Sequence, residues 1–205
     1  MGKKKLVEFM YEKEIVTIIR KYAYEKSEKD DIHGFSHVER VFNLCLRLGK
    51  KLGANLLILK VAALLHDIGR INKNKVYSNK NHAEMSAEMA SEFLKSNDFR
   101  LSYEVYDNII HSIKAHSFSN NISPKTLEAK ILSDADKLDA LGAIGLYRTI
   151  GFTVKNQGGI DQVIKHLENK IMKLKDLLFL DISRKIAKER QHIILDFYNK
   201  IKKER

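Results

Sequence analysis

Apolar residues recur at helical spacing along most of the chain. Ile18 and Ile19, for example, follow Ile15 by three and four positions, which places the three side chains on one face of a helix. The same pattern predicts helices over residues 6–26, 36–52, 55–68, 103–117, 125–149, 160–180 and 182–205, with a further helix after residue 81. The polar segment 72–81 is expected to be a loop.

Several helix ends carry local signals. Ser36 and Glu39 have the spacing of a capping box, so we expect the second helix to begin at Ser36. Gly53 and Gly69 are expected to end helices. The segment 55–68 between them is apolar nearly all round, which is typical of a buried central helix.

Low proline and glycine contents favour long helices over many turns. The 205 residues include one Pro and 10 Gly, against usual frequencies of about 5% and 7%. An all-β fold is therefore disfavoured, and we expect an all-α fold. The length suits a single domain over residues 1–205, with a core over about 30–150 and the helices over about 160–203 as a C-terminal extension.

Composition limits the possible environments and ligands. The lone Cys45 excludes a disulfide framework and a cysteine-based zinc site. No apolar run reaches the roughly 18 residues that a membrane span needs, so we expect a soluble, cytoplasmic protein. The 37 basic and 26 acidic residues leave a net charge of +11. That charge suits an anionic ligand such as a nucleotide or nucleic acid, or simply a solvated surface.

The most unusual local feature is the pair His66 and Asp67 at the end of the most apolar helix. A buried carboxylate without a partner costs several kcal/mol, so a cation is expected beside Asp67. A hydrogen-bonded His-Asp pair without a metal is the simpler alternative. On its own, the pair does not decide between these two arrangements.

Other polar residues on apolar helix faces favour a metal. His37 shares a helical face with Val41, and the apolar segment 131–141 carries three acids: Asp134, Asp136 and Asp139. Imidazole and carboxylate ligands suit Mn²⁺, Fe²⁺, Co²⁺, Ni²⁺ or Zn²⁺. Periodicity alone does not choose among the three acids.

Four sequence blocks resemble the HD-domain superfamily of metal-dependent phosphohydrolases. HGFSHVERV, ALLHDIG, NHAEMSAEMA and ILSDADKLDALGAIG are similar to blocks of a small bacterial and archaeal HD hydrolase branch. The resemblance implies an HD-type helical bundle, a divalent metal and hydrolysis of phosphate esters or anhydrides. It also implies the metal ligands His37, His66, Asp67 and Asp136.

Further residues are candidates for second roles. Asp67 is expected to orient the attacking water while it serves as a ligand. Three histidines are candidates for a second metal, for substrate binding or proton transfer, or for a structural role: His82, His111 and His116. Three more residues are candidates for phosphate contacts: His33, Arg40 and Lys137. The alternative is that His33 only stabilises its turn and that Arg40 and Lys137 are ordinary surface charges.

The predicted function is hydrolysis of a small phosphate substrate, with a nucleotide favoured. The expected nucleotide is either a monophosphate, which would release phosphate, or a triphosphate, which would release pyrophosphate. The triphosphate is slightly favoured. The cofactor is a divalent ion among Mn, Co, Ni, Mg, Fe and Zn. Two alternatives stay open: a non-catalytic module that binds nucleic acid or a nucleotide, and a di-iron oxygenase that uses the added histidines. The sequence does not identify the oligomeric state.

Overall fold

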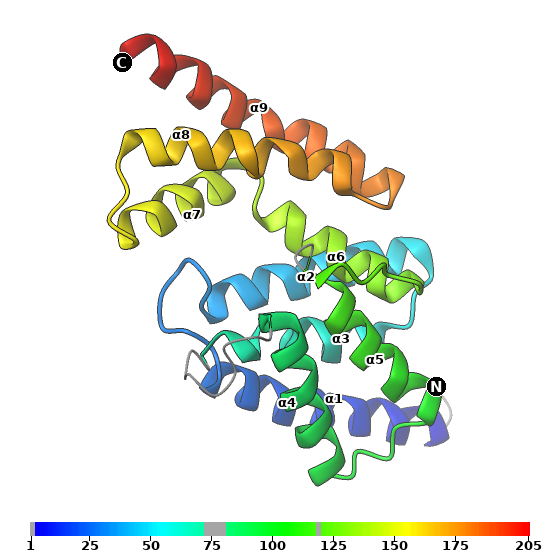
Figure 1. Ribbon diagram of the computed structural model, residues 1–205. Helices are drawn as coiled ribbons and strands as arrows, with labels where there is room; N and C mark the ends of the chain where they lie inside the picture. Colours follow the sequence, from blue (N-terminus) through cyan, green and yellow to red (C-terminus); the bar gives the residue numbers. More distant parts are fainter. Residues whose placement is uncertain (1–2, 72–80, 118–119) are drawn as a thin grey trace. The chain divides into compact units, whose positions relative to one another are not determined.

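A computed structural model describes residues 3–71, 81–117 and 120–205 of the chain, and it is helical throughout (Figure 1). Within these ranges β-type pairing is limited to an isolated bridge between Glu28 and Gly34. The predicted all-α fold is therefore confirmed. Apart from Asn81, the predicted loop over 72–81 lies outside the described residues.

The helices follow one another in two compact units, Met1–Leu132 and Ser133–Arg205. The first unit contains five helices and a short 3-10 helix: α1 (Lys3–Glu25), α2 (Phe35–Leu52), α3 (Leu56–Leu65), η1 (Ile68–Ile71), α4 (His82–Ser96) and α5 (Tyr103–Ala115). Helix α6 (Leu127–Asp139) spans the boundary. The second unit continues with α7 (Gly142–Lys155), α8 (Ile160–Asn169), the 3-10 helix η4 (Ile171–Leu177) and α9 (Asp181–Glu204).

Helix α3 is the centre of the first unit, as its apolar sequence predicts. It contacts α1, α2, α4 and α5, and Leu59, Val61 and Leu64 are wholly buried. Full burial of one such side chain contributes about 1.5 to 3 kcal/mol. The end of α3, where His66 and Asp67 follow, is thereby held in the middle of a packed core.

Two helix boundaries in the first unit differ from the prediction. Helix α2 begins at Phe35 with Gly34 at its N-cap, so Ser36 is not the cap. A side chain at position 34 would meet the Asp30 carbonyl oxygen at 1.9 Å, so the close turn there requires glycine. Helix α3 ends at Leu65 rather than at Gly69. Gly69 lies within the 3-10 helix η1, which follows.

Two long helices predicted for the C-terminal part are each interrupted. The predicted helix 125–149 is divided into α6 and α7, because Gly142 adopts φ +80° and so leaves the right-handed region. The predicted helix 160–180 ends at Asn169, where Lys170 departs from helical dihedrals (φ −128°, ψ −63°), and the 3-10 helix η4 follows. The predicted C-terminal helices over about 160–203 correspond to α8, η4 and α9.

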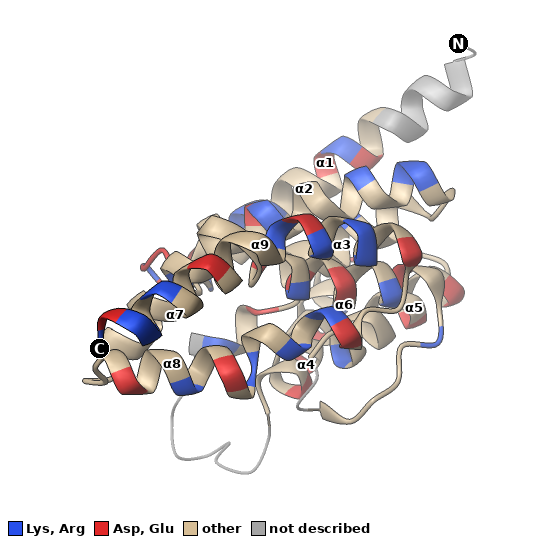
Figure 2. Ribbon diagram, turned by 90° about the horizontal axis from the view of Figure 1, so that it is seen from above, with Lys and Arg blue, Asp and Glu red and all other residues tan. Residues whose placement is uncertain are grey.

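Charge is spread along the helices of the second unit. Basic residues are interspersed with acidic ones along α8 and α9 (Figure 2). This distribution matches a solvated helix surface better than a concentrated anion-binding face. Among the helices in the described ranges, none combines the length and apolar character that crossing a membrane requires.

Candidate metal centre

His66 directly follows α3 and is wholly buried. Its Nδ1 lies 2.7 Å from the carbonyl oxygen of Ala63. Because a carbonyl oxygen only accepts hydrogen bonds, Nδ1 donates, and in the neutral ring Nε2 keeps its lone pair. This Nε2 lies 3.3 Å from Nε2 of His37 and 3.7 Å from Oδ2 of Asp67. His66 is thus held in the tautomer that metal-binding histidines adopt.

His116 repeats this arrangement at the end of α5. It is buried, and its Nδ1 lies 2.7 Å from the carbonyl oxygen of Ile113. Its Nε2 points to Asp67, 3.5 Å from Oδ1. Two helices that are distant in sequence therefore present Nε2 atoms to the same carboxylate.

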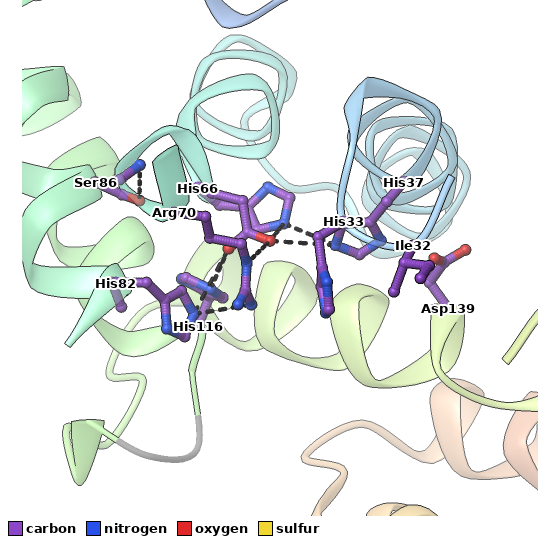
Figure 3. A network of polar contacts seen from close by, with 12 residues as sticks. Ile32, His33, His37, His66, Arg70, His82, Ser86, His116 and Asp139 are labelled. Carbon is purple, nitrogen blue, oxygen red and sulfur yellow. Dashed lines mark hydrogen bonds and ion pairs between the residues drawn. The ribbon is translucent and has the colours of Figure 1, made fainter. Parts of the chain in front are cut away.

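His37 and His82 contribute from the starts of α2 and α4. His37 is wholly buried, as its position on the apolar face of α2 predicts, and its Nε2 lies 3.5 Å from Oδ2 of Asp67. His82 is 21% exposed, and its Nε2 lies 3.6 Å from Oδ1 of the same carboxylate. Each oxygen of Asp67 therefore faces two histidines (Figure 3).

Asp67 is a buried carboxylate among potential cations. Burial by itself would raise its pKa, but the charge of Arg70, together with the polar contacts of His66, His116 and His37, holds the pKa well below its usual range. The side chain therefore stays ionised. Oδ1 accepts no hydrogen bond of ordinary length from the described residues. A buried anionic oxygen of this kind fits a cation as its partner.

Arg70, a cation in direct contact with Asp67, is not among the residues predicted from the sequence. It lies on η1, and its Nε donates to Oδ2 of Asp67 at 2.5 Å. A second guanidinium nitrogen lies 3.1 Å from Nε2 of His82. The spacing of three residues between Asp67 and Arg70 was the available signal, because it places two oppositely charged side chains on one side of a helical turn.

The close approach of η1 to α4 brings His82 to this cluster. The amide of Gly69 donates to Oγ of Ser86 at 2.9 Å. A Cβ atom at position 69 would lie 2.6 Å from the Ser86 nitrogen and 2.7 Å from the His82 carbonyl oxygen. Glycine is therefore required here for backbone contact, and it does not end the preceding α-helix as predicted.

Two groups of side chains in the first unit have donor atoms close enough to bind one ion. The first is His37, His66 and Asp67, and the second is Asp67, His82 and His116. All donor atoms within each group lie within 4.8 Å of one another. Asp67 belongs to both groups, so it is the residue on which the whole centre depends.

Other candidates in the first unit have local partners. His111 is not in either group, and its Nε2 accepts a hydrogen bond from the amide of Lys125 at 2.9 Å. Burial, with the nearby charge of Lys125, lowers the pKa of His111 and keeps this acceptor neutral. His33 is half-buried in the turn before α2, where its amide donates to Asp30. Arg40 is half-buried on α2.

The acids of α6 differ in their surroundings within the second unit. Asp134 accepts hydrogen bonds from the amides of Phe179 and Leu180 at 2.9 and 3.0 Å. Asp139 pairs with Arg148 at 2.7 Å. Both carboxylates therefore have structural partners. Asp136 is half-buried on the same helix.

Lys137, next to Asp136, is buried rather than at the surface. Its ammonium donates to the carbonyl oxygen of Ser133 at 3.1 Å and to Oγ of Ser133 at 2.5 Å. Burial lowers its pKa. The side chain is held against its own helix.

Residues 34–141, which contain the buried cluster, match the HD domain family. This range is more than half of the chain, so the protein belongs to the HD domain family, and the resemblance seen in the sequence blocks is confirmed.

The protein has relatives of similar length. It is 30% identical to the Bacillus subtilis protein YpgQ over 160 residues, 74% of each chain. A crystal structure of YpgQ in complex with ADP covers 95% of this chain and 97% of its own, with a TM-score of 0.76 and 27% identity. An HD-superfamily hydrolase from Bacillus thuringiensis has a TM-score of 0.71 and 26% identity over 94% of this chain and 97% of its own.

A more distant group of relatives is much longer. Ribonuclease Y from Thermoanaerobacter pseudethanolicus is 26% identical over 155 residues. That alignment covers 76% of this chain and 27% of ribonuclease Y. The similarity therefore concerns one part of the larger enzyme.

Proposed function

We propose that this protein is a divalent-metal-dependent phosphohydrolase that acts on a nucleotide. The single observation that carries the proposal is the buried carboxylate of Asp67, which faces the Nε2 atoms of His37 and His66 in a member of the HD domain family. An imidazole and carboxylate donor set suits a borderline transition-metal ion. The absence of a thiolate from this set argues against a structural zinc site.

The proposed ligands are His37, His66, Asp67 and Asp136. The first three belong to one compact group of donor atoms. Asp136 is chosen from the three acids of α6 because the family motif places the fourth ligand there. Four protein ligands on a six-coordinate ion leave two positions for water and substrate.

When bound, a divalent ion supplies a Lewis acid for the phosphoryl group and lowers the pKa of a water toward neutrality. The chain has side chains for the remaining tasks. Asp67 is suited to orient the water through its second oxygen. His116 lies on that side of Asp67 and, when protonated at Nε2, is a candidate to donate a proton to the leaving group. Arg40 and His33 are candidates for phosphate contact, and Lys137 supplies positive charge from α6.

A nucleotide is the favoured substrate for two reasons. The relative YpgQ binds ADP in its crystal structure and aligns along nearly the whole of this chain. The net charge of +11 favours an anionic substrate in general. A nucleoside triphosphate that releases pyrophosphate remains slightly preferred over a monophosphate that releases phosphate.

A panel of nucleoside mono-, di- and triphosphates with Mn²⁺, Co²⁺, Ni²⁺ or Mg²⁺ tests the proposal. We expect turnover of at least one nucleotide, with phosphate and pyrophosphate measured separately. His66→Ala should lose both metal binding and turnover. Arg47→Ala is a matched control, because Arg47 is exposed on α2. Lack of turnover across the panel by protein with bound metal would sink the proposal.

A second candidate is cleavage of a phosphodiester in RNA, which the similarity to ribonuclease Y favours. The two reactions use the same attack on phosphorus and differ in the leaving group. A short single-stranded RNA in the same assay separates them. Shortened RNA with no turnover of free nucleotides would favour this second candidate.

A further inference from the structure

Arg70 interacts with both groups of donor atoms in the first unit. Its Nε donates to Oδ2 of Asp67 at 2.5 Å, and its other guanidinium nitrogen lies 3.1 Å from Nε2 of His82. A guanidinium group can only donate, so His82 accepts this hydrogen bond through Nε2. Figure 3 shows Arg70 directed between His66 and His82.

The two acceptors differ in how many partners they can take. A carboxylate oxygen has two lone pairs, so Oδ2 can accept from Arg70 and also bind an ion on the side of His37 and His66. The Nε2 atom of a neutral imidazole has one lone pair. At His82 this lone pair is already used by Arg70, and an ion cannot share it.

The geometry points to Arg70 as the residue that takes the place of a second cation and limits the centre to one divalent ion. This inference rests on the proposed metal site. The group of Asp67, His82 and His116 has the donor atoms for another ion. With Arg70 in position, Nε2 of His82 is engaged, and the guanidinium that pairs with Oδ2 of Asp67 puts a positive charge next to His82, which repels a second ion there.

Removal of the guanidinium should therefore create a second site. In Arg70→Met, His82 regains its lone pair. His116 keeps the tautomer set by Ile113, and its Nε2 faces Oδ1 at 3.5 Å. These three donors resemble the first group in type, so they should accept the same class of ion.

The experiment counts Mn²⁺ ions per chain by equilibrium dialysis and mass spectrometry. We expect about one ion in the natural protein and about two in Arg70→Met, with about one again in Arg70→Met/His82→Ala. Electron paramagnetic resonance should show a coupled Mn²⁺ pair only in Arg70→Met. Arg47→Met is the control, because Arg47 is exposed on α2, and it should bind about one ion.

His82→Ala alone provides a test that does not require Arg70→Met to fold. If Arg70 rather than an ion uses His82, this variant keeps about one ion with an affinity within about threefold of the natural protein. Two ions in the natural protein, loss of an ion in His82→Ala, or a single ion in folded Arg70→Met would each overturn the inference. Binding of no ion by any variant would instead overturn the proposed function, and this inference with it.

Discussion

Asp67 in the first unit and Asp134 in the second are both buried carboxylates, but they have opposite surroundings. Asp134 accepts two backbone hydrogen bonds at the start of α9, yet burial is the larger influence and raises its pKa. Asp67 has Arg70 and four histidines around it, and its pKa is lowered in spite of burial. Burial is therefore common to the two acids, and the chemical type of their partners is what separates them.

The largest expected effect that separates the two acids is on activity. Asp67→Asn keeps the size of the side chain but removes the negative charge shared by both donor groups. Loss of an outer partner of a metal ligand costs about 10- to 100-fold, so loss of the ligand itself should reduce kcat/KM by more than about 100-fold. Steady-state kinetics and metal analysis measure this. Activity within a few fold of the natural protein would mean that Asp67 is not at the reaction centre.

Substitution of Asp134 should have the opposite pattern of effects: it should lower stability and leave catalysis unchanged. Asp134→Ala removes the acceptor for the amides of Phe179 and Leu180, which should lower the free energy of unfolding by about 1 to 3 kcal/mol. Urea denaturation measures this change. Asp181→Ala is the control, because Asp181 is highly exposed and its pair with Arg184 contributes about 0 to 1 kcal/mol. A large loss of kcat in folded Asp134→Ala would end the distinction between the two acids.

A smaller effect is expected from the contact that positions His82. Gly69→Ala forces η1 and α4 apart, because the added Cβ meets backbone atoms at less than 3.0 Å. We expect a loss of about 1 to 2 kcal/mol in unfolding free energy. Gly159→Ala is the matched control, since its nearest neighbour would be 3.7 Å away. Equal stabilities for both variants in thermal unfolding would contradict the requirement for glycine at position 69.

The smallest expected effect is on the pH dependence of stability. The folded-state pKa of Asp134 lies above its ordinary value of 3.8. At pH values between 3.8 and this raised pKa, the folded protein binds more protons at Asp134 than the unfolded chain does. The stability of the natural protein relative to Asp134→Asn should therefore fall as pH rises through this window. In metal-free protein, Asp67 has the opposite sign: its contribution is present above 3.8 and is lost as pH falls through its lowered pKa. Unfolding curves in chelator, measured against pH, test both signs.

Much of the fold and part of the candidate site could be predicted from sequence. Helical periodicity placed His37 on an apolar face, and the end of the most apolar segment placed His66 and Asp67 inside the core. These positions depend on side chains within a few turns of one another, so local pattern is enough. Helical spacing did not distinguish Asp136 from Asp134 and Asp139. The resemblance to the family motif is what selects Asp136 as the proposed fourth ligand.

Tertiary structure decided which other polar residues join the cluster. The resemblance to HD proteins makes both His111 and His116 candidates, but His111 accepts a hydrogen bond from the Lys125 amide while His116 faces Asp67. Likewise, the role of Asp134 depends on amides 45 and 46 residues further along the chain. No local pattern contains such partners.

The sequence by itself determined a helical protein of the HD type, with a His-Asp pair at the end of its central helix. Only the folded chain decided that Arg70 reaches both Asp67 and His82, because this contact requires the 3-10 turn after α3 and the close approach of Gly69 to α4. Helical periodicity describes which residues share a face. It does not describe a turn whose backbone direction is set by the helix packed against it.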